Sequence, residues 1–382
     1  MELLLAFTVA AAVFVGINIG GSSTGVAFGP SVGARLVSKP KAAGLMSLFV
    51  FLGGWTVGRN VVETMGGRIV PASQFSLTAS AVILFFVGLS LLISNLSGVP
   101  ASTSMTAVGA IAGLGLATNS LNRAVMAKIV SYWLVSPAVA FLAGGAIGRY
   151  LYIHLDDYFK IDRSDGNLLK YRGRIPVALE ETTTRREFFS GVLVVLIACY
   201  MAFSAGASNV ANAVAPLVAG GKGVLQMETG LLLGAAAISF GGFTIARKTL
   251  DTVGDGITEL PLLASLVVST VSASIITVLS AMGIPVSLAI SATMCITGLG
   301  WGRASRTVKV SETLQGKRPP LKTAALQTDE KKQIGEEEPS DIPDKRLFKP
   351  EVIRRVVKLW VLTPTLSAGA SYIVFTLIST TA

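Results

Sequence analysis

Charged residues, histidine and cysteine are all scarce in this chain. Only 14% of the 382 residues are charged, against about 25% in a typical soluble domain, and the mean hydropathy is +0.65. This composition excludes an ordinary soluble protein. A single histidine, His154, excludes histidine-based catalysis and histidine metal clusters. Cys199 and Cys295 both lie in apolar segments, which indicates small buried side chains rather than a disulfide framework or a metal site.

Sequence motifs of enzymes and of ATP-driven transport are also lacking. No P-loop pattern occurs, which disfavours ATP-driven import. No nucleophile, base and orienting group recur at a spacing that would build a catalytic site. We therefore expect no enzyme activity, no cofactor and no metal site.

Apolar runs of membrane length are abundant. Residues 77–93, 188–203, 262–282 and 356–377 each approach the ~20 residues with which a helix crosses about 30 Å of hydrocarbon. Residues 1–15 lack the basic start and the cleavage site of a secretory signal, so we interpret them as a retained first span. The sequence predicts an integral, multi-pass protein of the cell membrane, surrounded by the lipid bilayer.

Positive charge is concentrated in one loop. The net charge is +10, and residues 303–358 contain 14 of the 32 Lys and Arg residues. Because basic loops of membrane proteins face the cytoplasm, the loop 303–350 is predicted to be cytoplasmic. This explanation accounts for the charge without nucleic acid, which we exclude as a partner.

The sequence contains two copies of one repeat. Gly206 follows Gly20 by 186 residues, and Pro285 follows Pro100 by 185. The element Trp-x-x-Ser-Pro at 133–137 recurs as Trp-x-x-Thr-Pro 227 residues later, because the charged loop is inserted in the second copy. Near-constant offsets over separate landmarks indicate duplication.

The duplication defines the predicted organisation. Residues 1–153 form a first transmembrane repeat, 154–187 a polar linker and 188–382 a second transmembrane repeat. We expect an all-α polytopic membrane protein of about ten to twelve transmembrane segments, with broken or re-entrant helices at matching Gly and Pro positions. An odd number of crossings in each repeat would invert the second copy. We favour this inversion because it suits alternating access.

A Gly/Ser-rich segment in each repeat is the candidate binding site. Residues 20–25 read Gly-Gly-Ser-Ser-Thr-Gly, and residues 204–212 read Ser-Ala-Gly-Ala-Ser-Asn-Val-Ala-Asn. A helix interrupted in hydrocarbon is tolerated where a polar ligand satisfies its backbone, and a helix N-terminus with hydroxyl donors suits an anion. Asn209 and Asn212 lie one helical turn apart and share a face. The alternative is close helix packing through small residues.

Hydroxyl groups also follow the paired prolines. Ser102, Thr103 and Ser104 come after Pro100, and a proline suits the first turn of a helix. The alternative is that these hydroxyls bond back to carbonyls of their own helix. The predicted substrate-binding residues are Gly21, Ser22, Ser23, Thr24, Ser102, Thr103, Ser104, Ser208, Asn209, Asn212 and Ser287.

Charges within apolar segments form matching pairs. Arg59 precedes Glu63, and Arg247 precedes Asp251, each by four residues, which is the spacing of a helical ion pair. Such a pair is either a structural salt bridge at the membrane interface or a coupling and gating element for an anion or a proton. Glu228 is a further candidate proton carrier.

These motifs resemble those of the inorganic phosphate transporter (PiT) family. Residues 206–213, Gly-Ala-Ser-Asn-Val-Ala-Asn-Ala, are similar to the family signature Gly-Ala-Asn-Asp-x-x-Asn-Ala, and residues 27–33 resemble its continuation, Phe-Gly-x-Ser-Val-Gly. Residues 100–105, Pro-Ala-Ser-Thr-Ser-Met, resemble the second signature, Pro-Val-Ser-Thr-Thr-His. The resemblance implies a transporter whose signatures bind a small inorganic oxyanion.

The departures from the family pattern bear on the substrate. Ser23 and Asn209 stand where the family has aspartates, and Met105 replaces the histidine. Phosphate keeps a proton at neutral pH and benefits from an acceptor, whereas sulfate needs only donors. The chain therefore looks like the sulfate permease branch of the family. Because the missing aspartates are plausible sodium ligands, proton coupling is favoured over sodium coupling.

The sequence thus predicts a secondary transporter that moves sulfate by alternating access. An inorganic phosphate symporter is the alternative, and an anion channel is a more remote one. The expected partners are sulfate or phosphate and the bilayer, with a homodimer also allowed.

Overall fold

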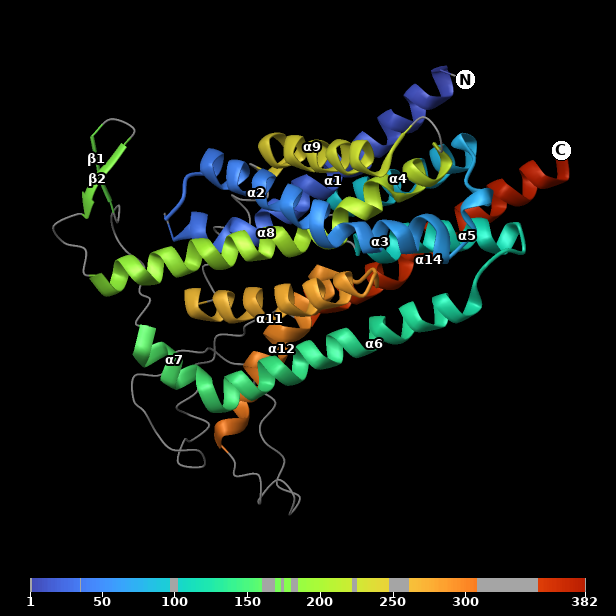
Figure 1. Ribbon diagram of the computed structural model, residues 1–382. Helices are drawn as coiled ribbons and strands as arrows, with labels where there is room; N and C mark the ends of the chain where they lie inside the picture. The colour runs from blue at the N-terminus through green and yellow to red at the C-terminus, as the bar shows by residue number, and fades with distance from the viewer. Residues whose placement is uncertain are drawn as a thin grey trace, which may run out of the picture.

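The computed structural model describes residues 2–34, 36–96, 102–159, 169–172, 175–179, 185–221, 225–246, 261–307 and 350–381. Nearly all of them lie in helices that run roughly side by side (Figure 1). The α-helices are α1 (Glu2–Gly33), α2 (Lys39–Gly53), α3 (Arg59–Glu63), α4 (Leu77–Leu96), α5 (Thr103–Ala117), α6 (Arg123–Ala146), α7 (Tyr152–Phe159), α8 (Arg185–Gly220), α9 (Met227–Thr244), α11 (Leu262–Ala281), α12 (Leu288–Ala304) and α14 (Pro350–Thr381).

Shorter elements complete these helices. Three π-helical segments continue the long helices: η1 (Gly54–Gly58), η2 (Thr64–Arg68) and η4 (Ile147–Leu151). Two 3₁₀ turns are η3 (Ala72–Gln74) and η6 (Ser305–Thr307). Among the described residues, the one departure from an all-α fold is an antiparallel hairpin in the polar linker, β1 (Leu169–Arg172) with β2 (Ile175–Leu179).

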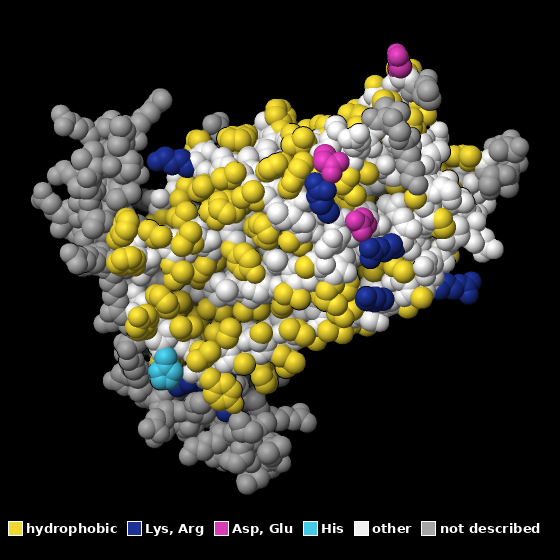
Figure 2. Space-filling view, in the orientation of Figure 1, with side chains coloured by type: hydrophobic (Ala, Val, Ile, Leu, Met, Phe, Trp, Pro, Cys, Tyr) yellow, Lys and Arg dark blue, Asp and Glu magenta, His cyan; other side chains and the backbone are white. Residues whose placement is uncertain are grey.

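Seven of the described helices are long and apolar enough to cross a membrane. They confirm an integral, multi-pass membrane protein, and Figure 2 shows apolar side chains covering most of one side of the helical bundle. The predicted ten to twelve segments exceed these seven, and α5, α9 and α12, with 15, 18 and 17 residues, are further helices outside that set. Their lengths lie within or just below the roughly 17–25 residues of a membrane-crossing helix.

The predicted breaks at the two Gly/Ser segments are wrong. Residues 20–25 lie inside the uninterrupted helix α1, and residues 204–209 lie inside α8. The glycines permit close helix contact instead, since a Cβ atom on Gly20 would overlap the Ile238 carbonyl of α9. The helix keeps its own backbone hydrogen bonds, so no ligand is needed to satisfy them. The alternative considered for these segments, small-residue packing, therefore explains their glycines.

The chain leaves the helical path at Pro285. After α11, residues 284–287 are non-helical and buried, and α12 begins at Leu288. In the first half, α4 ends at Leu96 and α5 begins at Thr103, while Pro100 lies outside the described residues. Helices α4 and α11 each have 20 residues and start 185 positions apart.

Helix contacts recur at equivalent positions of the two halves. Gly20 of α1 lies against the Ile238 carbonyl of α9, and Gly206 of α8 lies against the Val50 carbonyl of α2. Likewise α5 packs on α14, and α12 packs on α6. Figure 1 shows that α1 and α8 run in opposite directions, with α8 starting at the end where the hairpin lies. Each half therefore packs against the other through the same elements.

Candidate functional site

The centre of α8 carries two asparagines that meet the start of α5. The Asn209 Oδ1 atom accepts a hydrogen bond from the Thr103 hydroxyl at 2.9 Å and from Asn212 Nδ2 at 3.2 Å. Asn212 Nδ2 also lies 3.2 Å from Thr103 Oγ1 and 3.1 Å from Ser104 Oγ. Asn209 and Asn212 share a helix face because they are three residues apart, as predicted. Both are buried, with 5% and 0% of their surface exposed.

Ser208 connects α5 to the non-helical segment before α12. Its hydroxyl donates to the Val286 carbonyl at 2.9 Å and lies 3.3 Å from Ser104 Oγ. Since the Ser208 proton is used toward Val286, Ser104 is the donor in the second contact. A continuous chain of donors thus runs from Asn212 through Ser104 and Ser208 to the backbone beside Ser287.

Ser102 and Ser287 begin two equivalent helices. The Ser102 hydroxyl accepts from the Met105 N–H at 3.3 Å, and the Ser287 hydroxyl accepts from the Ile290 N–H at 3.4 Å. The residues that the sequence places in the binding set are therefore N-caps of α5 and α12. Both helices start beside α8, so the positive ends of two helix dipoles meet there. This arrangement favours an anion.

The two positions where the family has aspartates meet each other. Asn209 Nδ2 donates to Ser23 Oγ at 3.4 Å, joining α8 to α1. Ser23 is 8% exposed. The first Gly/Ser segment therefore contributes one side chain, Ser23, to the network, and two equivalent residues of the two halves lie in contact.

Three other predicted residues of the first segment do not join this network. The hydroxyl of Ser22 bonds back to the Asn18 and Ile19 carbonyls, and that of Thr24 bonds back to the Gly20 carbonyl. A Cβ on Gly21 would meet the Ile245 side chain, so this glycine is a packing residue. These are the back-bonding and small-residue alternatives already considered.

The network is neutral and rich in donors. Its side chains are amides and hydroxyls from Ser23, Thr103, Ser104, Ser208, Asn209 and Asn212. The described part of the chain holds no group of three or more His, Cys, Asp or Glu side chains that could bind a metal ion. The buried Asn212 Oδ1 accepts no hydrogen bond from any described residue. Such a site can donate to an oxyanion but offers no carboxylate.

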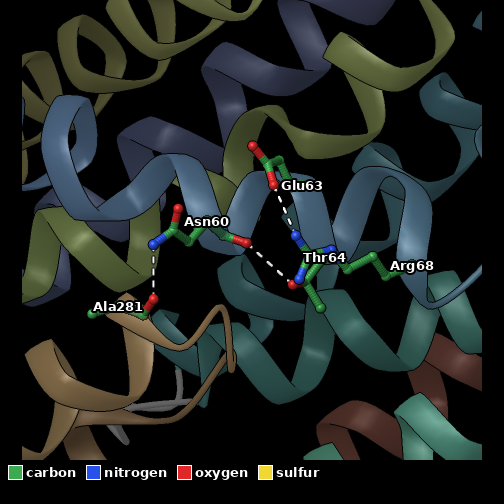
Figure 3. Close-up of polar contacts among 5 residues, drawn as sticks. All are labelled: Asn60, Glu63, Thr64, Arg68 and Ala281. Atoms are coloured by element: carbon green, nitrogen blue, oxygen red, sulfur yellow. Dashed lines mark hydrogen bonds and ion pairs between the residues drawn. The ribbon is translucent and has the colours of Figure 1, made fainter.

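The predicted Arg59–Glu63 pair is wrong, because each residue has another partner. Arg59 Nη1 lies 3.0 Å from Glu228 Oε1, and its guanidinium also stacks over the Trp55 ring. Glu63 pairs with Arg68 at 2.9 Å (Figure 3). An exposed arginine takes whichever carboxylate its rotamer reaches, and spacing alone does not determine that. Arg247 and Asp251 lie outside the described residues.

The environment of Glu228 bears on its predicted role as a proton carrier. This residue lies in the first turn of α9, outside the seven candidate spans. The Glu228 carboxylate accepts a hydrogen bond from its own backbone N–H and one from Arg59, and both lower the pKa of Glu228. The carboxylate therefore keeps its charge in this state and joins α9 to the helix that carries Arg59.

Sequence reasoning missed Asn60, which holds the end of α11. Asn60 Nδ2 donates to the Ala281 carbonyl at 2.7 Å, and Thr64 Oγ1 donates back to the Asn60 carbonyl at 3.1 Å (Figure 3). Ala281 precedes Gly283, whose φ of 71° turns the chain into the non-helical segment. The only available signal was a polar side chain inside an apolar run.

Comparison with known proteins identifies the family of the chain. The model of the phosphate transporter family matches residues 19–371, so the chain belongs to that family. The family consists of membrane transporters, and the chain is accordingly an anion transporter.

Named relatives are similar over most of their length. The sulfate permease CysP of Bacillus subtilis is 28% identical over 365 residues, which cover 95% of this chain and 85% of the relative. A putative phosphate permease of Haemophilus influenzae is 26% identical, covering 76% of this chain and 86% of the relative. A solved structure, a sodium-dependent phosphate transporter, has the same fold, with a TM-score of 0.67, 21% identity and full coverage of both chains.

Proposed function

We propose that the protein is a secondary permease for a small inorganic oxyanion, with sulfate as its substrate. The observation that carries the proposal is the neutral contact between Ser23 and Asn209. Aspartates at both positions would place two carboxylates side by side and supply an acceptor for the proton that phosphate keeps. A serine and an asparagine there leave a site of hydrogen-bond donors. Sulfate carries no proton, so donors are all that it needs. The similarity to a protein named sulfate permease supports the same substrate.

Binding rearranges the hydrogen bonds of the network. The hydroxyls of Thr103, Ser104 and Ser208 now donate to protein oxygens. An oxyanion placed between α5, α8 and α12 would take over these donors together with the first N–H groups of α5 and α12, which have no partner within their helices. The charge of the anion is then balanced by two helix dipoles rather than by a basic side chain.

Transport by alternating access fits the reciprocal packing of the two halves. We propose residues 1–153 and 188–382 as inverted repeats, with the site between them near the bilayer midplane. The opposite directions of α1 and α8 support the inversion (Figure 1). Arg59 and Glu228 join elements of different repeats, and we propose this ion pair as a gating contact that breaks when the repeats move.

Protons are the proposed coupling ion. The described network contains no carboxylate, and a hard cation such as Na⁺ prefers several oxygen ligands of that kind. The fold is shared with a protein named as sodium-dependent, so sodium coupling is the competing proposal. The homodimer stays a prediction.

Uptake into proteoliposomes tests the substrate. The purified protein should take up radiolabelled sulfate, and the uptake should saturate and respond to an imposed pH gradient but not to a sodium gradient. Phosphate uptake that excess sulfate does not inhibit would instead favour the phosphate symporter. Ohmic single-channel currents in planar bilayers would favour a channel.

A further inference from the structure

One face of α11 carries a line of buried serines. Ser265, Ser269, Ser272 and Ser280 follow one another by four, three and eight residues, so they share a helix face with Ile276. Their exposed fractions are 4%, 6%, 0% and 0%. This face therefore points into the bundle, although it is polar along most of its length.

Several of these hydroxyls are unsatisfied. Ser265, Ser272 and Ser280 make no side-chain hydrogen bond to any described residue, and neither does the fully buried Ser291 on the neighbouring helix α12. Two other hydroxyls of α11 bond back to their own helix, Thr270 to the Leu266 carbonyl and Ser274 to the Thr270 carbonyl, both at 2.8 Å. The Thr277 hydroxyl, next to Ile276, also has no partner among the described residues. Burying a hydroxyl without a partner costs about 1–3 kcal/mol, so a row of them calls for a partner in another state of the protein.

The middle of the equivalent face of α4 is apolar and buried. An offset of 185 residues relates Ser269 to Leu84, Ser272 to Val87 and Ile276 to Leu91. These three α4 side chains are 0%, 0% and 2% exposed.

The two polar residues on that α4 face are both satisfied. Ser80 donates to the Pro216 carbonyl at 2.6 Å, and Asn95 donates to Asn18 Oδ1 at 3.1 Å. Hence the two repeats differ: the polar side chains on this face of α4 are hydrogen-bonded, while α11 carries unsatisfied hydroxyls.

The serine face leads from the candidate site to one end of the molecule. The Ala273 carbonyl, next to Ser272, accepts from Ser204 at 3.1 Å, one helical turn before Ser208 of the network. At the start of α11, Leu263 packs in a cluster with Tyr152 of α7. Ser265 and Ser280 are separated by about 22 Å along the helix. Figure 1 places α7 and the start of α11 at the end where the hairpin lies.

We propose that this α11 face forms one wall of the path by which the anion passes between the site and the α7 end. The serine hydroxyls donate to the anion and to its water when the repeats move apart, and they lie unsatisfied in the closed state described here. The inference rests on the proposed function for its cargo, but it assigns a route and an asymmetry that the proposed function does not contain. The equivalent α4 face, which carries Leu84, Val87 and Leu91, is predicted to stay closed to solvent.

Cysteine labelling tests the route with a matched control. Both native cysteines, Cys199 and Cys295, are buried and are replaced by alanine to give the background. Ser269→Cys and Ser272→Cys are compared with Leu84→Cys and Val87→Cys, the equivalent positions of α4. Reconstituted protein is treated with 2-sulfonatoethyl methanethiosulfonate, an anionic thiol reagent, and the mass shift is followed with and without saturating sulfate.

The expected result is labelling of the two α11 cysteines about tenfold faster than the two α4 cysteines, with slower labelling in sulfate. Equal rates at the two helices, or no labelling of α11 while uptake persists, would overturn the route. Fast α11 labelling that neither sulfate nor phosphate slows would support the route and contradict the proposed cargo. Size-exclusion profiles show which variants are folded, and Ser265→Cys serves as a third α11 position.

Discussion

At the scale of single residues, Asn212 and Asn209 each make three hydrogen bonds in the network. The Asn212 amide nitrogen contacts Thr103, Ser104 and Asn209, whereas Ser287 caps α12. Asn212→Ala leaves buried acceptors unpaired and should lower sulfate uptake about tenfold. Ser287→Ala removes one cap, worth about 1 kcal/mol, and should change uptake much less. Equal uptake by the two variants in proteoliposomes would contradict this assignment.

The contact between Ser23 and Asn209 makes a prediction about selectivity. Asn209→Asp restores a carboxylate where the family signature has one, and it supplies an acceptor for protonated phosphate while repelling sulfate. The ratio of phosphate to sulfate uptake should rise about tenfold, which corresponds to ~1.4 kcal/mol. Asn95→Asp is the control because Asn95 donates to Asn18 and to no residue of the network. A rise of the same size in the control would show that the effect is not specific to the site.

At the scale of elements, glycines decide how closely the helices approach. A Cβ on Gly20 would overlap the Ile238 carbonyl, whereas a Cβ on Gly44 of α2 meets nothing within 4 Å. Gly20→Ala should therefore lower the free energy of unfolding by about 1–3 kcal/mol through overpacking. Gly44→Ala should be neutral or stabilising by up to about 1 kcal/mol. Thermal unfolding in detergent compares them, and similar melting temperatures would argue against close packing of α1 and α9.

The ion pair between Arg59 and Glu228 joins two elements that the gating proposal requires to separate. Because both side chains are partly exposed, the pair should contribute little to stability. Glu228→Arg should nevertheless slow uptake, since two positive charges then repel across the contact. The double variant Arg59→Glu with Glu228→Arg should recover part of the rate. Failure of the double variant to exceed the single one would remove the pair from the gating mechanism.

At the scale of the whole molecule, the basic loop predicts which end faces the cytoplasm. His154, on α7, and Thr118, at the end of α5, are both exposed and lie at opposite ends of α6 (Figure 1). In a cysteine-free background, an impermeant maleimide should label Thr118→Cys in intact cells. It should label His154→Cys only in inverted membranes. The opposite pattern would place residues 303–350 outside the cell.

The sequence alone determined the class of the protein and its internal offsets. Long apolar runs force helices in a bilayer, because every backbone polar group must be satisfied within its own segment. The matching landmarks around Gly20 and Gly206 identified Ser23, Asn209 and Asn212 as candidate binding residues from the sequence alone. These residues could be predicted because motif chemistry is local.

Only the tertiary structure decided which polar groups meet. In the fold, Gly20 and Gly206 lie inside continuous helices, and Ser102 and Ser287 are helix N-caps. Arg59 pairs with a residue of another element. The line of serines on α11 was visible in the sequence, but its burial and its contrast with α4 were not. Residue types report what a side chain can bind, whereas the packing of distant helices determines what lies within reach of it.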